Sequence, residues 1–268
     1  MIRVRTPLRL PFAGGLTDIK QYAARHGGVT VSSTIDLGVE VSFEPRAARG
    51  FTVRAAGSSE TAGRPEELAN DLVRAALARV GYVGAGLDIE VAVEVQDHSG
   101  LGASGAITVA LVHALRLLRG EQPSPERLAD DATFIEVDIL GGASGYHDAN
   151  VCARGGLLRI DYDGPRATAT PLSTPAGFLE AFQDSILLFA TGRRASTKAS
   201  LGLLSAGLDS ALDVLHDMKA LAADTAAAFE AGELHRLLLP VGAAHEHVAA
   251  DLAARELRAR ARRPNLRT

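Results

Sequence analysis

A glycine-rich loop at residues 100–105 carries the strongest chemical signal in the sequence. It reads Gly-Leu-Gly-Ala-Ser-Gly and separates an expected strand, which ends at Gln96, from an expected helix that begins near Ala106. Glycine lets the backbone approach a ligand closely, and the free N–H groups at the start of the helix favour an anion such as phosphate. The hydroxyl of Ser104 would lie in the first helical turn, within reach of a phosphate oxygen or a metal ion. The loop therefore predicts a nucleoside-triphosphate site.

Three other interpretations of this loop stay open. The pattern also matches the dinucleotide fingerprint G-x-G-x-x-G, although the preceding strand alternates in polarity and Glu121, the acidic residue about 20 positions on, lies in a polar loop. Residues 102–106 approach the hydrolase motif G-x-S-x-G with alanine in the last position, and Asp184 and His245 would be its partners. The third interpretation is a tight turn without a ligand. No Walker sequence G-x-x-x-x-G-K-[ST] occurs in the chain.

A second glycine cluster occupies residues 11–18 and ends in Asp18. It follows the basic residues Arg5 and Arg9, so positive charge, flexible backbone and a carboxylate occur within fourteen residues. A carboxylate in this position could bond the hydroxyls of a sugar, or it could simply cap a helix after a turn. Both interpretations stay open on this segment alone.

A third glycine cluster occupies residues 141–148 and ends in Asp148. It follows an expected helix that contains Glu136. A carboxylate held in a glycine-rich loop is a candidate general base or metal ligand, and a solvated loop residue is the alternative.

The elements that must position these groups follow from hydrophobic periodicity. Residues 87–96 alternate between apolar and polar side chains, which predicts a strand with one buried face in an antiparallel sheet. Further strands are predicted at residues 36–43, 51–54, 157–162 and 185–190. Helical spacing predicts helices at residues 65–80, 106–119 and 125–140, and again from residue 201 onward.

A change in composition divides the chain into two parts. Residues 163–175 are polar and contain proline, so we predict a boundary there, with domains at residues 1–165 and 166–268. The second part offers the strand 185–190 and then only helices, followed by an Arg/Ala-rich tail. It therefore looks incomplete as a sheet-containing unit.

Composition excludes several classes of protein. Lys and Arg number 28 against 32 Asp and Glu, a net charge of −4 that argues against a nucleic-acid-binding surface. No apolar run approaches the ~20 residues that span a bilayer, and residues 1–7 do not resemble a signal peptide, so we expect a soluble cytoplasmic protein. The single cysteine, Cys152, excludes an intramolecular disulfide and is expected to be a packing residue. His245 and His247 would lie ~200° apart on a helix, so they cannot share a metal ion there.

In order along the chain, the three glycine segments resemble the GHMP small-molecule kinases, the family of galactokinase, homoserine kinase, mevalonate kinase and phosphomevalonate kinase. Residues 5–18 resemble the opening signature R-x-P-x-R-x-x-F-x-G-G-x-T-D of the D-glycero-D-manno-heptose 7-phosphate kinase branch. Residues 97–106 resemble the family's phosphate loop, P-x-x-x-G-L-G-S-S-A-A. Later similarities to the stretch I-E … G-x-Q-D-Q … G-G occur at residues 135–136, 145–148 and 155–156.

The resemblance implies a fold and an activity. The expected fold is α+β and two-domain, with an N-terminal ribosomal-protein-S5-domain-2-like half and an incomplete C-terminal half. The implied activity is ATP- and Mg²⁺-dependent phosphoryl transfer to a hydroxyl of a sugar or sugar phosphate, with no nucleic-acid or membrane partner. A homodimer stays open.

Site residues carry over by position in the motifs. Ser104 and Glu136 would hold Mg²⁺ with the β- and γ-phosphates. Asp148 would accept or orient the proton of the sugar hydroxyl, and Arg9 would neutralise charge near the transferred group. The loop residues expected at ATP are Gly100, Leu101, Gly102, Ala103, Ser104 and Gly105. The residues expected at the sugar are Arg5, Gly15, Thr17 and Asp18.

The sequence departs from the family pattern in several places. His98, Ala103 and Gly105 change the phosphate loop, while His147 and Ala149 replace the glutamines that flank Asp148. The family's C-terminal glycine-rich motif is absent, so we expect a truncated member or a tail read in a shifted frame. Two rival functions follow: a descendant that binds nucleotide or sugar without turnover, and an NAD(P)-dependent oxidoreductase that uses the loop at 100–105.

Overall fold

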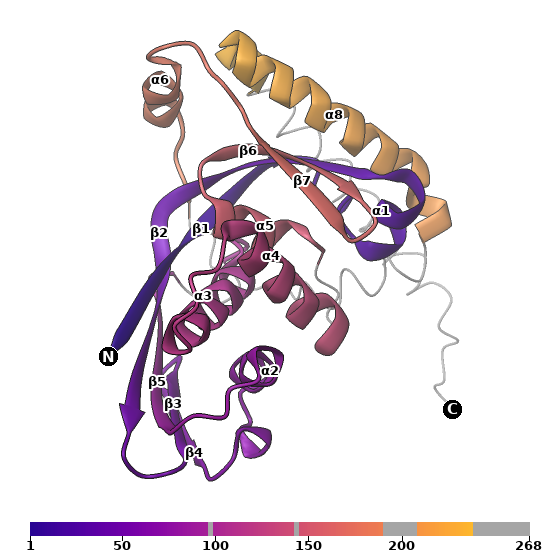
Figure 1. Ribbon diagram of the computed structural model, residues 1–268. Helices are drawn as coiled ribbons and strands as arrows, with labels where there is room; N and C mark the ends of the chain where they lie inside the picture. The colour runs from indigo at the N-terminus through magenta and orange to yellow at the C-terminus, as the bar shows by residue number, and fades with distance from the viewer. Residues whose placement is uncertain (96–98, 142–144, 190–207, 238–268) are drawn as a thin grey trace, which may run out of the picture.

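The computed structural model describes residues 1–95, 99–141, 145–189 and 208–237, and its framework is a curved sheet (Figure 1). In these residues the sheet has seven strands. They are β1 (Ile2–Ala13), β2 (Gly28–Arg46), β3 (Phe51–Ala55), β4 (Ser58–Ala62), β5 (Gly86–Val93), β6 (Leu157–Asp163) and β7 (Arg166–Pro171).

The long strand β2 organises the sheet. The strand order is β4-β3-β5-β2-β6-β7, and β1 also pairs with β2. The C-terminal half of β2, residues 39–46, pairs with β5, while residues 28–33 pair with β6. All described pairings are antiparallel except that of β3 with β5, which is parallel. The sheet is therefore mixed, where the sequence predicted an antiparallel one.

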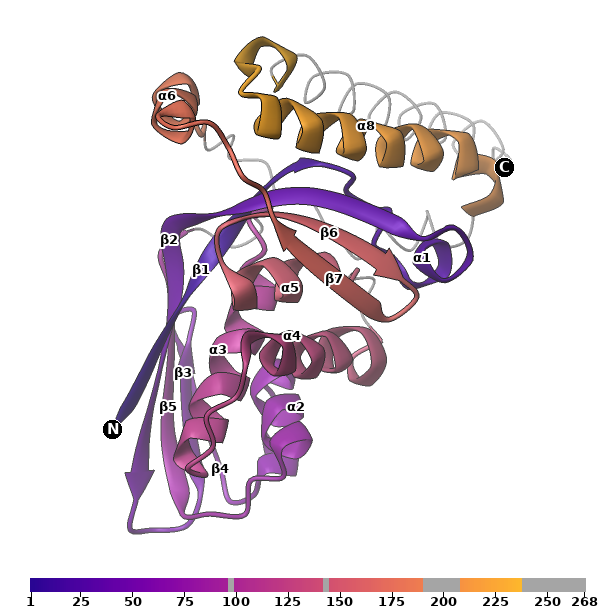
Figure 2. The ribbon, with the colours of Figure 1, turned by 45° about the horizontal axis from the view of Figure 1, so that its top comes forward.

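Helices cover both faces of the sheet. The helices are α1 (Lys20–His26), α2 (Asp71–Val80), α3 (Ala103–Leu118), α4 (Pro125–Thr133), α5 (His147–Arg154), α6 (Phe178–Ser185) and α8 (Leu212–Ala231). Short 3₁₀ turns occupy Pro65–Glu67 and Leu208–Ala211, and a π-helical turn occupies Phe134–Ile139. Figures 1 and 2 show α8 on the face of the sheet opposite α3, α4 and α5.

Each face of the sheet has its own apolar core. On one face, Val39, Val41 and Phe43 of β2 are fully buried in a cluster that includes residues of α2 and α3. On the other face, Val29 and Val31 pack with residues of α6 and α8. Simple alternation would place these odd-numbered residues of β2 on one face. The pairing of β1 with β2 is irregular between residues 34 and 38 of β2, so the two halves of this long strand can contribute to different cores.

Several of the predicted elements are confirmed. Strand β5 has the expected alternation, since Leu87 and Ile89 are fully buried whereas Glu90 is exposed. The predicted helix at 65–80 is interrupted, because a 3₁₀ turn at Pro65–Glu67 ends at Leu68 and Asn70 caps α2 by accepting a hydrogen bond from the N–H of Val73. The helix predicted at 106–119 starts three residues earlier than expected, at Ala103.

The strand predicted at residues 185–190 is wrong. Residues 186–189 form no strand; they follow α6, and Leu187 and Phe189 are exposed, while residue 190 lies outside the described residues. The polar stretch 163–175, where a domain boundary is predicted, contains β7, which pairs with β6. This hairpin crosses the predicted division between residues 165 and 166, and the two-domain division itself stays a prediction. Across the described ranges, no helix is long and apolar enough to cross a bilayer.

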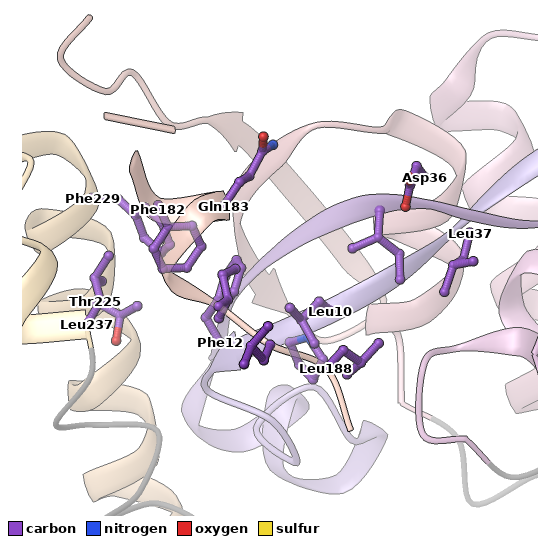
Figure 3. Close-up of a pocket in the computed structure, with 14 residues that line it drawn as sticks. Leu10, Phe12, Asp36, Leu37, Phe182, Gln183, Leu188, Thr225, Phe229 and Leu237 are labelled. Carbon is purple, nitrogen blue, oxygen red and sulfur yellow. The ribbon is translucent and has the colours of Figure 1, made fainter. Parts of the chain in front are cut away.

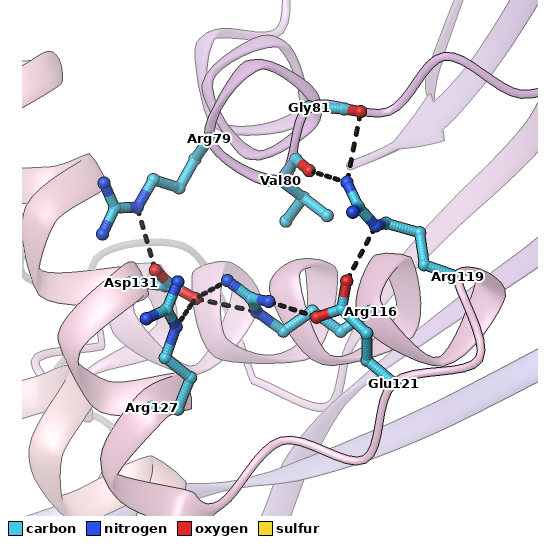
Figure 4. A network of polar contacts seen from close by, with 8 residues as sticks. All are labelled: Arg79, Val80, Gly81, Arg116, Arg119, Glu121, Arg127 and Asp131. Atoms are coloured by element: carbon cyan, nitrogen blue, oxygen red, sulfur yellow. Dashed lines mark hydrogen bonds and ion pairs between the residues drawn. The ribbon is translucent and has the colours of Figure 1, made fainter.

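A buried carboxylate joins the helices that support the site (Figure 4). Asp131 of α4 is fully buried and accepts hydrogen bonds from Arg79 of α2 at 2.9 Å and from Arg116 of α3 at 2.8 Å. Arg127 adds a third contact, at 3.2 Å, and Glu121 pairs with Arg116 and Arg119. Since a buried charge is tolerated only when it is paired, this network fixes α4 against α2 and α3.

Candidate active site

The loop at residues 100–105 leads directly into α3. Gly102 precedes the helix and cannot supply a side-chain cap, so the first-turn N–H groups of α3 have no cap hydrogen bond within the described structure. The loop carbonyls are engaged instead: the backbone N–H of Arg9 donates to the carbonyl of Leu101 at 3.0 Å. The loop is thus held by its carbonyls, and the helix start presents N–H groups to an anion.

Ser104 and Glu136 lie together, as a shared metal site requires. The Ser104 hydroxyl donates to Oε1 of Glu136 at 3.2 Å, and Thr108, one turn further along α3, donates to the same oxygen at 2.8 Å. Glu136 lies in the π-helical turn that continues α4, and such turns often re-aim functional side chains. In the described ranges no group of three or more His, Cys, Asp or Glu side chains could hold a metal ion.

This pair of oxygen donors fits Mg²⁺ rather than a metal held by a full protein cage. Mg²⁺ is usually bound by one or two protein oxygens, with phosphate oxygens and water completing its shell. Glu136 is 5% exposed, so its buried carboxylate stands beside the hydroxyl that would share the ion.

Arg9 and Asp148 form the second pair. Nε of Arg9 donates to Oδ1 of Asp148 at 2.8 Å, and an Nη of the same guanidinium lies 2.7 Å from that oxygen. The other Nη donates to the carbonyl of Gly100. Arg9, on β1, therefore connects the glycine loop at residues 100–105 to the start of α5, where Asp148 lies. Gly105 has no space for a side chain because Asp148 packs against it, so the two pairs share one region.

Asp18 is buried beneath this region. Its Oδ2 accepts the backbone N–H of His147 at 3.0 Å, and its backbone carbonyl accepts the N–H of Tyr146. A Cβ at position 145 would lie 1.8 Å from Oδ2 of Asp18, so any larger residue there would have to displace this carboxylate. Burial, with the nearby charge of Asp148, raises the pKa of Asp18 to about 6. The structure thus places Asp18 as a support for α5.

The other predicted sugar contacts lie in different settings. Thr17 is fully buried, and its hydroxyl bonds the carbonyls of Gly14 and Val29 and accepts the N–H of Val29. The Thr17 hydroxyl therefore holds the turn to β2, and its contact with substrate stays a prediction. Gly15 has open space around it. Arg5 is half-exposed and pairs with Glu94 at 2.9 Å rather than with Asp18 or Asp148.

Burial and the charge of Arg9 shift the pKa values of the ionisable side chains in the site. Burial alone would raise the pKa of Asp148, but the guanidinium of Arg9 and the neighbouring His147 hold it below its ordinary value. Burial and the charge of Arg9 lower the pKa of His147 to about 4, so this imidazole is neutral at pH 7. Cys152 is buried close by, and its pKa is raised by burial and by Asp148, which fits the predicted packing role.

Two residues of this region, Ser32 and Thr108, were missed from the sequence, and His147 was noted only as a departure from the family pattern. Thr108 could have been found, since it lies four residues after Ser104 and so on the same face of α3. Ser32 could not, because only the pairing of β2 with its neighbours brings it to α5. His98 and the segment with His245 and His247 lie outside the described residues.

A separate cavity of about 660 Å³ lies between β1–β2 and the helices α6 and α8 (Figure 3). Its walls are mainly apolar and include Leu10, Phe12, Phe182, Leu188 and Phe229. Arg9, Ser104 and Asp148 do not line it. This cavity is therefore distinct from the site predicted around the glycine loops.

The rival interpretations of the loop fit the structure poorly. A dinucleotide fold needs a parallel, doubly wound sheet, whereas the described sheet is almost entirely antiparallel. The hydrolase interpretation needs a histidine at the serine, but the described partner of the Ser104 hydroxyl is Glu136. Asp184 lies on α6, and His245 lies outside the described residues.

Comparison with known proteins agrees with the resemblance to the GHMP kinases. Residues 67–156 match the family model described as the GHMP kinases N terminal domain. The chain is 30% identical over 141 residues to a mevalonate kinase of Methanothermobacter thermautotrophicus. That alignment covers 53% of this chain and 46% of the relative, so it spans less than half of the relative's length.

Solved structures share the fold over most of the chain. A D-glycero-D-manno-heptose 1-phosphate kinase from Bacteroides thetaiotaomicron superposes with a TM-score of 0.79 at 20% identity, covering 92% of this chain and 78% of that chain. A Streptococcus pneumoniae phosphomevalonate kinase, solved with phosphomevalonate and AMPPNP, gives a TM-score of 0.70 at 14% identity over 91% and 78% of the two chains. The chain therefore has the GHMP kinase fold, and the match at residues 67–156 together with these structures supports the GHMP kinase family.

Proposed function

We propose that this chain transfers the terminal phosphoryl group of ATP to a hydroxyl of a sugar or sugar phosphate. GHMP kinases are ATP-dependent phosphotransferases, and the observation that carries the proposal is the convergence of two polar pairs at the start of α3. Ser104 with Glu136 and Arg9 with Asp148 come from four separate parts of the chain. A purely structural glycine turn would not require them together.

Each group of the site has a role in binding. The N–H groups of residues 100–105 would hold the ATP phosphates, and Ser104 and Glu136 would hold Mg²⁺. The metal, when bound, supplies positive charge that offsets the negative charge of the phosphates. Asp18, buried beneath this region, and Gly15, which has open space around it, would border the sugar.

Asp148 and Arg9 would act in the transfer step. The sugar oxygen forms a bond to the γ-phosphorus, the bond from that phosphorus to the β–γ bridging oxygen breaks, and ADP leaves. The hydroxyl proton passes to Asp148, whose lowered pKa makes it an acceptor that acts as the new bond forms rather than before. Arg9 would keep Asp148 ionised and add positive charge near the transferred group.

The proposed substrate is a heptose phosphate, most like D-glycero-D-manno-heptose 7-phosphate. The opening signature at residues 5–18 supports this choice, and a structural neighbour is described as a kinase of the related heptose 1-phosphate. A mevalonate-type acceptor is the alternative that the sequence relative suggests.

A two-part experiment tests the proposal. Release of ADP from Mg-ATP is measured with heptose 7-phosphate, galactose, homoserine and mevalonate as acceptors, and thermal unfolding is followed with Mg-ATP, NAD or NADP. Acceptor-dependent ADP release, with stabilisation by Mg-ATP, would support a kinase. Stabilisation without release would indicate a binding protein that has lost turnover, and a response to NAD or NADP alone would overturn the proposal.

A further inference from the structure

His147 lies between a serine and the candidate catalytic carboxylate. Its ring is buried at the first turn of α5. Nε2 lies 2.5 Å from the hydroxyl oxygen of Ser32 on β2, and Nδ1 lies 3.4 Å from Oδ1 of Asp148. Both ring nitrogens therefore face oxygen atoms, and those two oxygens have different chemistry.

The two oxygens determine which nitrogen carries the proton. A carboxylate oxygen can only accept, so a bare Nδ1 lone pair beside Asp148 would be repelled. A serine hydroxyl can donate, and the hydroxyl of Ser32 can donate to a bare Nε2. Burial and the charge of Arg9 keep the ring neutral, so it carries a single proton. The arrangement with all groups satisfied places that proton on Nδ1.

The backbone of His147 is held as firmly as its ring. Its N–H donates to Oδ2 of Asp18 at 3.0 Å, and the close contact of Asp18 with Gly145 leaves that carboxylate little room to move. Ser32 is fully buried on β2, whose pairing with β1 and β6 fixes its position. The imidazole is thus fixed at both ends and cannot turn without breaking a buried hydrogen bond.

The protein contacts only one of the two carboxylate oxygens of Asp148 among the described residues. Nε and one Nη of Arg9 and Nδ1 of His147 all approach Oδ1. Among the described residues no hydrogen bond is made to Oδ2, and the side chain is 27% exposed. One oxygen is held by the protein while the other is available to a ligand.

We propose that His147 is a positioning residue: Ser32 fixes the tautomer that carries its proton on Nδ1, and this N–H holds Oδ1 of Asp148 so that Oδ2 faces the acceptor hydroxyl. The catalytic part of this inference rests on the proposed function, because it takes Asp148 as the group that meets the hydroxyl. The tautomer and its control by Ser32 do not depend on any activity.

The tautomer is measured by long-range ¹H–¹⁵N correlation of the imidazole nitrogens in the ¹⁵N-labelled chain. The His147 signals are identified by their loss in His147→Gln. The expected spectrum at pH 7 shows a protonated Nδ1 and a bare Nε2. Ser32→Ala should convert this pattern to a mixture of tautomers, while Ser32→Thr, which keeps the hydroxyl, should preserve it. Ser33→Ala is the matched control, since the Ser33 hydroxyl bonds the carbonyl of Thr34 instead.

Kinetics then separate positioning from packing. With the acceptor identified by the ADP-release assay, His147→Phe keeps a ring but removes the donor, and kcat should fall about tenfold, the effect of losing one hydrogen bond to a charged group. The KM for ATP should stay within about twofold. His147→Gln should recover part of kcat, because an amide can donate to Oδ1.

Several outcomes would overturn the inference. A proton on Nε2 in the unmodified chain, or a spectrum unchanged by Ser32→Ala, would remove Ser32 from its role whether or not the chain turns over. Equal kcat values for His147→Phe and the unmodified enzyme would remove His147 from catalysis. Thermal unfolding shows whether each variant still folds. If Ser32→Ala does not fold, the spectrum of Ser32→Thr, which keeps the hydroxyl, tests the tautomer instead. No transfer to any acceptor would count against the proposed function alone.

Discussion

A Cβ atom built on Gly105 would lie 2.6 Å from the Cβ atom of Asp148. The same atom would lie 3.0 Å from the backbone nitrogen of Ala149, so neither a rotamer change nor a small side-chain movement could make room. The first turns of α3 and α5 are therefore in direct contact. This contact is what brings the helix start proposed to bind phosphate and the candidate catalytic carboxylate into one region.

Gly105→Ala should separate the two helices. The added methyl group must push Asp148 aside, which should cost about 1–3 kcal/mol of stability and lower transfer at least tenfold. Thermal unfolding and steady-state ADP release measure the two effects. Gly63→Ala is the control, because its nearest neighbour is the end of the flexible Glu67 side chain at 3.3 Å. If both variants behave alike, the close contact has no functional consequence.

Asp148→Asn should abolish transfer while leaving ATP binding near normal. The amide keeps the shape of the carboxylate but cannot accept the hydroxyl proton, so we expect a loss of ~10²–10⁴-fold in kcat. Titration calorimetry with Mg-ATP checks that the affinity changes by less than about threefold. Asp163→Asn changes an exposed residue of the β6–β7 hairpin and should leave both values unaltered. Full activity of the Asp148 variant would exclude it from the transfer step.

Ser104→Ala and Glu136→Gln should each raise the Mg²⁺ concentration needed for half-maximal activity. Ser104→Ala removes an oxygen ligand, and Glu136→Gln replaces a charged carboxylate oxygen by a neutral amide oxygen, in a pair that lies 3.2 Å apart; both changes weaken a site for a divalent cation. Activity is measured against free Mg²⁺ at a fixed ATP concentration. Thr108→Val tests support from the neighbouring hydroxyl, which bonds Glu136, and it should shift the titration less. An unchanged titration for Ser104→Ala and Glu136→Gln would refute the metal assignment.

Asp131→Ala should destabilise the chain strongly. The change leaves Arg116, whose side chain is 10% exposed, without its buried partner, and breaking a buried ion pair typically costs about 3–5 kcal/mol. Asp130→Ala alters the exposed neighbour on the same helix and should cost little. Urea unfolding of the two variants gives the comparison. Equal stabilities would mean that the network in Figure 4 adds nothing to the fold.

Asp18→Asn should change how stability depends on pH. In the folded chain burial raises the pKa of Asp18 from its ordinary value of 3.8 to about 6, so its proton is bound more tightly than in the unfolded chain. The stability from this proton is therefore full below pH 3.8 and is lost as the pH rises through 6. A neutral asparagine avoids that loss.

The free energy of unfolding is compared for the two proteins from pH 4 to pH 7. As the pH rises, the free energy of unfolding of the variant should increase relative to that of the unmodified chain, by up to about 3 kcal/mol at pH 7. His147 acts in the opposite direction in both proteins, since its lowered pKa removes stability as the pH falls from 6.5 towards 4. The difference between the two curves isolates Asp18. If the difference in free energy of unfolding stays constant from pH 4 to pH 7, burial does not raise the pKa of Asp18.

Local patterns in the sequence predicted much of the framework. The alternation at residues 87–96 identified β5 because one face of that strand packs on the core and the other meets solvent. The apolar spacing after residue 106 identified most of α3 for the same reason. The strand predicted at 185–190 is wrong because an apolar run forms a strand only with a partner, and residues 186–189 have none among the described strands.

By itself, the amino-acid sequence determined which residues are able to do chemistry here: a glycine loop with a serine, two carboxylates after glycine clusters, and an arginine on the first strand. Only the tertiary structure decided which contacts they make. It turned Thr17 inward to bond backbone, placed Asp18 beneath α5, and brought Ser32 to His147 from 115 residues away. The physical reason is that a residue's type limits which hydrogen bonds it can form, whereas burial and partners from distant strands and helices select which of them it does form.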